Sequence, residues 1–515
     1  MRSMLQNKKT WSYFKKIAGT ACFFVILAYV FIHVTYLFRG DIANRENVVG
    51  IKEEEPLDVV YIGGSAAYCY WEPLKAWGDC GFTSYDLATS GIEAESILYY
   101  MKLALKYHSP KLFVVGVRAF EYYSGEGTET GVRRTSDALD FLDMDRYRFI
   151  ETYLNNRTLD IDKWPLYLDI AKYHTNYEAL ASPESWALLH NSTQSLSKGS
   201  HIQTYFYYME EPQEFRTMER AELKENASAT LLELLDFCKE EDLEVLFVVS
   251  PYSITERDYA IYNTIEDIVS EYGYRFLNTN DHYAEMDFKF AEDFSDGSHV
   301  NSLGAEKYTA FLENYLLENY QLPDHREESR YAKWNELYAQ YAAESSAGRA
   351  DVRSMIELAQ QGKAAADELY GSIDDTAAWC DLARDPRFTV IAVGEGESLS
   401  AVSYKDIKAL ESLGLQGLNT DNYIRVLCGQ EVLYSNADTG ESSCEIDIGP
   451  ASNRDSSCII DNTLQGASVL IHHEECSRKD KEGINIVVYE NDYRYMIDSF
   501  TIKADADGNL LFLRQ

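Results

Sequence analysis

The chain has 515 residues, of which 46% are hydrophobic, and it contains 39 tyrosines and 22 phenylalanines. A chain of this length is too long for one ordinary hydrophobic core, so we expect two or three packed domains. The high hydrophobic and aromatic content excludes a disordered chain. The 84 acidic and 47 basic residues give a formal charge of -37, which disfavours nucleic acid and makes a neutral glycan an easier substrate than teichoic acid.

The first predicted element is the apolar stretch Ile17–Phe38. At ~1.5 Å per residue it is long enough to cross a hydrocarbon core of ~30 Å. Four lysines precede it, which favours a cytoplasmic tail at residues 1–16: Lys8, Lys9, Lys15 and Lys16. A cleaved signal peptide is the alternative, but no small-x-small site follows before Glu53–Glu55. We predict a single-pass signal anchor in the cell membrane, with everything after about residue 40 outside the cytoplasm.

Residues 55–322 contain five strand-like segments with helical stretches between them. Their apolar, β-branched runs are typical of strands that are buried on both faces. We therefore predict an α/β domain with a parallel sheet covered by helices on both sides. The expected strands are Leu57–Ile62, Thr83–Leu87, Lys111–Val117, Leu243–Ser250 and Tyr274–Leu277.

Three residues of interest directly follow the first three strands: Ser65, Gly91 and Arg118. Reactive groups gather at the carboxyl ends of the strands in such sheets. A glycine pair before Ser65 allows a sharp turn that presents the hydroxyl. We predict that Ser65 is a nucleophile, and that an oxyanion is stabilised by the amides of Ser65 and Gly91 and by the Arg118 guanidinium.

A second motif, Asp296-Gly-Ser-His299, places a carboxylate three residues before an imidazole. The acid is then close enough to orient the base, so we predict His299 as general base and acid and Asp296 as its orienting group. Each motif also has a purely structural interpretation. Ser65 can be a helix-capping serine, and Asp296–His299 can be a surface turn. Arg118 can equally form an ion pair with Glu121 or Asp86.

The order of these blocks resembles the SGNH/GDSL hydrolase superfamily, although Gly116–Glu121 has arginine where Gly-x-Asn-Asp is expected. With the anchor, the chain is similar to membrane-anchored SGNH-like proteins of alginate O-acetylation and teichoic-acid D-alanyl transfer. The resemblance implies transfer of an acyl group, foremost acetyl, to hydroxyls of a cell-surface polysaccharide, with a membrane-bound O-acyltransferase as partner. A carbohydrate esterase with the same triad and a catalytically silent glycan-binding scaffold remain alternatives.

Residues 323–383 are predicted to form a helical linker, with a break at Ser345–Gly348. Residues 384–515 change to short strands and turns, which predicts a mostly-β, sandwich-like domain containing a helix at Tyr404–Leu413. Phe388–Val393 and Gly483–Tyr489 are two of its expected strands. Two segments resemble the interleukin-like EMT inducer (ILEI)/PANDER domain: Thr389–Val393 continuing to Ala409–Gly414, and Gly483–Tyr489 continuing through Ile497–Phe500. The resemblance implies a carbohydrate-binding or partner-docking module.

Nine cysteines occur without a C-x-x-C pair, which argues against a zinc ribbon. Bridges Cys69–Cys80 or Cys444–Cys458 and reduced, partly buried thiols are all compatible with the spacing. The run His472–Cys476 is unsuitable for a tetrahedral metal site because its side chains are adjacent on one segment. We predict no metal and no cofactor.

Three charged residues lie further along the chain after the third predicted strand: Arg133, Arg134 and Asp137. They can line the cleft, but a solvated helix start is the simpler interpretation.

Overall fold

The computed structural model describes residues 2–209, 211–370, 375–450, 456–463, 466–471, 474–491 and 495–514. The chain forms two compact units, which we treat separately. The first, here the α/β unit, comprises Met1–Ile202, Pro212–Phe288 and Ala305–Glu344. The second, here the β-rich unit, comprises Gln203–Glu211, Lys289–Gly304 and Ser345–Gln515.

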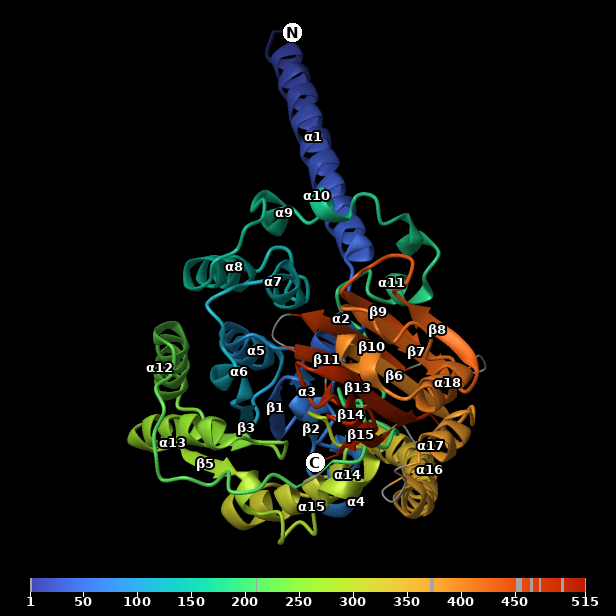
Figure 1. Ribbon diagram of the computed structural model, residues 1–515. Coiled ribbons are helices and arrows are strands. Elements are labelled where there is room, and N and C mark those ends of the chain that lie inside the picture. The colour runs from blue at the N-terminus through green and yellow to red at the C-terminus, as the bar shows by residue number, and fades with distance from the viewer. Residues whose placement is uncertain are drawn as a thin grey trace. The chain divides into compact units, whose positions relative to one another are not determined.

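The α/β unit is built on a five-stranded parallel sheet of order β2-β1-β3-β4-β5 (Figure 1). The strands β1, β2 and β4 are buried at every position, as their apolar runs predict. The predicted parallel sheet is confirmed, and the strands differ from the prediction only at their ends. They are β1 Val59–Gly63, β2 Ser84–Ala88, β3 Leu112–Gly116, β4 Val245–Val249 and β5 Arg275–Asn278.

Helices flank this sheet. Helix α5 packs against β1, α4 against β2 and α13 against β5. The helices that lie wholly in this unit are α1 Arg2–Phe38, α2 Ile42–Val49, α3 Ser65–Tyr68, α4 Pro73–Cys80, α5 Ala94–Tyr107, α6 Arg118–Glu121, α7 Glu129–Ser136, α8 Met144–Asn156, α9 Trp164–Tyr167, α10 Ile170–Tyr173, α11 Pro183–Ala187, α12 Glu225–Glu240 and α13 Glu256–Glu271. Short 3₁₀ turns are η1 Gly50–Glu53, η2 Tyr177–Leu180, η3 Thr279–Asp281 and η4 Ser329–Tyr331.

Helix α1 contains the predicted anchor. Its segment Tyr13–Phe38 is long and apolar enough to cross a membrane. Large side chains such as Phe23, Phe24 and Val25 are exposed on it, which water alone would not favour. The orientation of the helix and the extracytoplasmic location of the units remain predictions.

A buried ion-pair network holds the end of α1 to the α/β unit. Arg39 donates from Nε and Nη2 to Asp169 Oδ2, at 3.0 and 2.7 Å. Its Nη1 donates to the carbonyls of Asp137 and Leu139 at 2.7 and 3.0 Å. Arg146 pairs with the other carboxylate oxygen of Asp169. Burial opposes the charge of Arg39, but Asp169 and Asp137 raise its pKa.

The predicted solvated helix start at Arg133–Asp137 is wrong for two of its three residues. Arg133 lies in the last turn of α7 and is buried, as is Asp137 behind it. The Arg133 guanidinium is 3.7 Å from Asp137 and 3.9 Å from Asp169, so it belongs to the same network. The burial arises because the partner Asp169 comes from a distant part of the sequence.

The β-rich unit contains two antiparallel sheets, with strand orders β15-β14-β13-β6-β7-β8 and β12-β11-β10-β9. Alternate residues of β6 face different cores. Val390 and Ala392 pack with the helices α17 (Thr376–Ala383) and α18 (Tyr404–Leu413), whereas Ile391 and Val393 pack against the smaller sheet. The predicted sandwich-like domain is confirmed. Its strands are β6 Phe388–Glu395, β7 Tyr423–Cys428, β8 Glu431–Ser435, β9 Ser443–Ile448, β10 Ser456–Thr463, β11 Gly466–Ile471, β12 Glu474–Glu475, β13 Gly483–Glu490, β14 Tyr495–Ala504 and β15 Leu510–Leu513.

The remaining helices are α14 Phe290–Asp293, α15 Ser302–Asn319, α16 Ala332–Tyr370, α17 Thr376–Ala383, η5 Glu397–Ala401 and α18 Tyr404–Leu413. Helix α18 has the predicted bounds and is terminated by Gly414, whose φ is 119°. The expected break at Ser345–Gly348 is wrong, because α16 continues through it. One glycine costs a helix only about 1 kcal/mol, and the flanking alanines and charged residues favour helix.

Two proposed disulfides are not formed. Cys80, Cys444 and Cys458 are free thiols, so neither Cys69–Cys80 nor Cys444–Cys458 is bridged. Burial raises the pKa of the Cys458 thiol, which keeps it protonated and unreactive.

Candidate functional site

The carboxyl ends of three neighbouring strands meet at one edge of the α/β sheet. β1 lies between β2 and β3, and Gly63 is the register partner of Ala88. A Cβ on Gly63 would lie 3.9 Å from the Cα of Gly116 at the end of β3. The segments that carry Ser65, Gly91 and Arg118 therefore start side by side.

Ser65 is the first residue of α3, and it follows Gly64, which has an extended conformation. A Cβ on Gly64 would lie 3.3 Å from the Ile92 side chain, and one on Gly63 would lie 3.0 Å from Ala67. The glycine pair thus permits a tight turn against the segment that follows β2. Ser65 is half-buried. Its amide lies at the start of this short helix.

Gly91 has a φ of 55°, a left-handed conformation that favours glycine. Its loop is held from two sides at the preceding residue, Ser90. Arg134 donates to the Ser90 carbonyl at 2.6 Å, and Asn44 accepts from the Ser90 amide at 2.8 Å. Tyr122 donates to the carbonyl of the residue after Gly91 at 2.8 Å. Arg134 was named in the sequence as a candidate for lining the cleft, whereas Asn44 and Tyr122 were missed, because each comes from a different element.

Arg118 opens α6, and its guanidinium stacks on the Tyr252 ring at 4.0 Å from the centroid. Burial opposes its charge, but neighbouring tyrosines raise its pKa. Arg118 also acts electrostatically on Glu121, whose pKa burial and Asp258 raise to about 7. The predicted alternative of an ion pair with Asp86 is wrong, because the buried carboxylate of Asp86 has no hydrogen-bond partner among the described residues and burial alone raises its pKa.

The β-rich unit contains the Asp296–His299 pair. His299 Nδ1 lies 2.8 and 2.9 Å from the two oxygens of Asp296. The amides of Ser298 and His299 donate to Asp296 Oδ1 at 2.8 and 2.9 Å. Burial works against the carboxylate, but these hydrogen bonds from the ring and the backbone lower the pKa of Asp296. The acid therefore stays ionised, and it fixes the imidazole with Nδ1 as its hydrogen-bond donor.

Asn301 holds this loop in place and was not singled out in the sequence. It is fully buried, and its Nδ2 donates to the carbonyls of Glu292 and Phe294 at 2.7 and 3.0 Å. Its Oδ1 accepts from the amides of Leu303 and Gly304 at 2.9 and 3.2 Å, at the start of α15. One amide side chain thus connects both ends of the segment that carries the Asp-His pair.

Asn301→Asp is expected to destabilise the protein by about 1–3 kcal/mol, because a carboxylate of the same shape has no N–H to donate to the two carbonyls. Thermal unfolding of the full-length protein measures this. Asn226→Asp is the matched control, since the Asn226 amide donates to a carbonyl at an exposed position. An unchanged melting temperature for Asn301→Asp would show that the clamp does not hold the loop.

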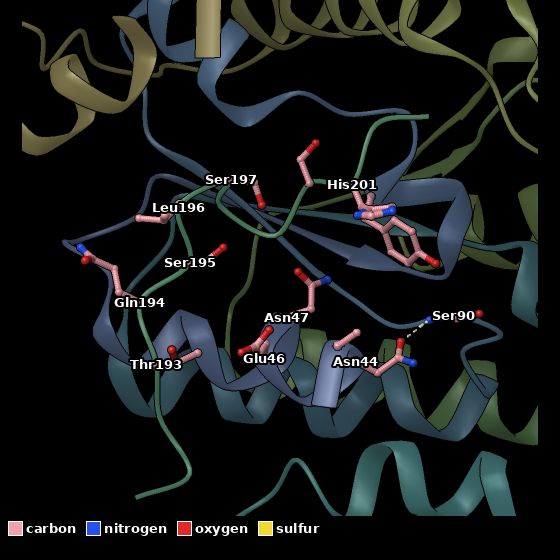
Figure 2. Close-up of a pocket in the computed structure, with 13 residues that line it drawn as sticks. Asn44, Glu46, Asn47, Ser90, Thr193, Gln194, Ser195, Leu196, Ser197 and His201 are labelled. Carbon is pink, nitrogen blue, oxygen red and sulfur yellow. Dashed lines mark hydrogen bonds between the residues drawn. The ribbon is translucent and has the colours of Figure 1, made fainter. Parts of the chain in front are cut away.

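A cavity of about 540 Å³ lies wholly within the α/β unit. Ser90, the neighbour of Gly91, is one of its lining residues, whereas Ser65, Gly91 and Arg118 do not line it. Figure 2 shows Asn44, Glu46 and Asn47 of α2 on one side, facing the segment that contains Thr193 to Ser197. Ser90 and Tyr68, three residues after Ser65, complete its wall with His201. Burial raises the pKa of Tyr68 to about 12, so its hydroxyl remains a hydrogen-bond donor at neutral pH. Most of the lining side chains carry a hydroxyl or an amide group, and Glu46 adds a carboxylate.

The predicted residues thus fall into two sets. Ser65, Gly91 and Arg118 belong to one edge of the α/β unit, and Asp296 and His299 form a bonded pair in the β-rich unit. Within the described ranges no group of three or more His, Cys, Asp or Glu side chains is placed to hold a metal ion. His472 and His473 lie outside those ranges.

No protein-family model matches the chain. No curated protein matches it either. Among solved structures, the chain is similar to a gut microbial diltiazem-metabolizing enzyme, with 10% sequence identity and a TM-score of 0.19. The match covers 53% of this chain and 49% of that enzyme, so the chain spans about half the length of the enzyme.

Proposed function

We propose that this chain is a membrane-anchored, extracytoplasmic SGNH-type enzyme that transfers an acyl group, foremost acetyl, to hydroxyls of a neutral cell-surface glycan. The observation that carries the proposal is the Asp296–His299 pair, in which an ionised carboxylate holds Nδ1 of the ring at 2.8 Å. Such a pair has the geometry of the base half of a serine acyl-transfer triad, which supports the proposal. Ser65, after the first strand of a parallel sheet, is the nucleophile in this proposal.

The reaction has two balanced steps. A ring that donates from Nδ1 has its lone pair on Nε2, which takes the proton as Ser65 Oγ attacks the acyl carbonyl. The amides of Ser65 and Gly91, with Arg118, stabilise the oxyanion, and His299 returns the proton to the leaving group. A glycan hydroxyl then gives its proton to His299 and attacks the acyl-serine. As the bond between the acyl carbon and Ser65 Oγ breaks, His299 passes this proton to Oγ, which releases the glycan ester and restores Ser65.

The cavity supports a sugar as the acceptor. Neutral hydroxyl and amide groups pair with sugar hydroxyls without the desolvation cost of a charged ligand. The net charge of -37 disfavours polyanionic acceptors. In this proposal a membrane-bound O-acyltransferase supplies the acyl group from the cytoplasmic side, and the C-terminal ILEI/PANDER-like domain binds glycan.

Ser65→Ala tests the proposal. In reconstituted full-length protein it is expected to lower the release of nitrophenol from p-nitrophenyl acetate by at least about 10³-fold, because no alcohol remains to be acylated. Mass spectrometry should find an acetyl group on Ser65 in the parent protein alone. Ser124→Ala, an exposed serine of the same unit, is the control.

If Ser65→Ala and the parent protein release nitrophenol at the same low rate, the proposal is contradicted and a glycan-binding scaffold is favoured. Acyl-serine that decays at the same rate with and without glycan would identify water as the acceptor, and therefore an esterase.

A further inference from the structure

The α/β unit carries a group of exposed apolar side chains that the proposed chemistry does not use. They lie on α9, η2, α11 and the connecting segments, and we call them the collar: Leu142, Trp164, Leu168, Tyr177, Leu180 and Trp186. Trp164 is 76% exposed, Leu142 73% and Tyr177 66%. The surfaces of soluble proteins rarely expose so many large apolar side chains together, so we expect the collar to be covered by a binding partner or a membrane.

The collar surrounds the base of the anchor helix. η2, α10 and α11 contact α1, and α9 contacts α10. Figure 1 shows α9, α10 and α11 at the end of the α/β unit from which α1 projects. The Phe141 ring, next to Leu142, lies 5.9 Å from the ring of Phe31 on α1. His190 and His33 of α1 make a similar contact at 4.8 Å.

The length of the free helix shows how deep the collar must lie. From Tyr13 to Val30 α1 is largely exposed, from Phe31 it is partly covered, and from Thr35 it is buried. From Ile17, the first residue after the lysines, to Val30 the helix is roughly 21 Å long at ~1.5 Å per residue. A hydrocarbon core of ~30 Å is longer than that, so the span reaches into the segment that the collar's own helices cover.

We infer that the collar is seated in the outer interface of the lipid bilayer, so that the α/β unit rests on the membrane and does not hang from a flexible stalk. Tryptophan and tyrosine suit this depth, because their rings are apolar and their N–H and O–H groups reach water. The exposed charged residues of the same segments are more often acidic than basic: Asp160, Asp162, Glu178 and Glu184 against Lys163 and Lys172. The contact is therefore driven by apolar burial, and it does not need anionic lipid.

The tryptophans of the chain allow a direct test. Trp71, Trp77, Trp334 and Trp379 are buried in the protein, with at most 1% exposure. In a Trp11→Phe background, Trp164 and Trp186 are therefore the two tryptophans that lipid can reach. The protein is reconstituted in phosphatidylcholine vesicles whose acyl chains carry bromine near the headgroup or near the methyl end.

Brominated lipid is expected to quench the tryptophan emission, more strongly from the shallow position than from the deep one, and equally at low and high salt. Trp164→Phe with Trp186→Phe should abolish the lipid quenching, whereas Trp334→Phe should leave it unchanged. Quenching of Trp164 and Trp186 by aqueous iodide, with none by brominated lipid, would overturn the inference. That result would show a collar that faces water and is available to a protein partner.

Discussion

Replacing His299 by Gln, or Asp296 by Asn, is expected to lower the rate of acyl transfer by about 10³- to 10⁴-fold. The glutamine of His299→Gln cannot take the proton of Ser65. The asparagine of Asp296→Asn presents an N–H where the ring needs an acceptor, which favours the wrong tautomer. Steady-state release of nitrophenol from p-nitrophenyl acetate measures both variants. The effect is expected in kcat, because the interactions with the bound ester are unchanged.

The chain offers a matched control for this pair. His282 is also an imidazole with a carboxylate three residues away, and its Nδ1 lies 2.9 Å from Glu285 Oε1. His282→Gln removes a similar hydrogen bond and is expected to leave the rate unchanged. A comparable loss in His282→Gln and His299→Gln would mean that His299 acts through stability alone.

Asp296 also makes the pair dependent on pH. Its folded pKa lies below the unfolded value, so its contribution to stability is present at neutral pH and is lost as the pH falls through the folded pKa, below about 4. The difference in melting temperature between the parent protein and Asp296→Asn should therefore shrink in strong acid.

Asp169→Asn is expected to destabilise the α/β unit by about 3–5 kcal/mol, because it leaves two fully buried arginines, Arg39 and Arg146, without their shared anion. The change lies far along the chain from the proposed triad, so the loss should appear as poor expression and a lower melting temperature. Thermal unfolding of the full-length protein in detergent measures it.

The control is Asp267→Asn, since Asp267 pairs with Arg220 at an exposed position. Its removal is expected to leave the melting temperature unchanged, because solvent screens this pair. Equal behaviour of Asp169→Asn and Asp267→Asn would show that the network at the base of α1 does not stabilise the unit.

Local patterns in the sequence were enough to predict most of the strands and helices of the fold. Runs such as Val59–Ile62 and Leu112–Val115 read as buried strands, and α18 could be bounded by its glycine stop. The Asp296–His299 contact was also predictable, because three residues separate the partners and one turn of backbone brings them together. Long-range pairing was not needed for any of these.

Contacts between distant segments could not be predicted in this way. Arg39 and Asp169 are 130 residues apart, and the cavity forms where α2 meets residues 193–201. The loop of Gly91 depends on Arg134 and Asn44, which come from other elements. A single sequence records the residue types of such partners but not their pairing, because folding pairs them through the packing of whole elements.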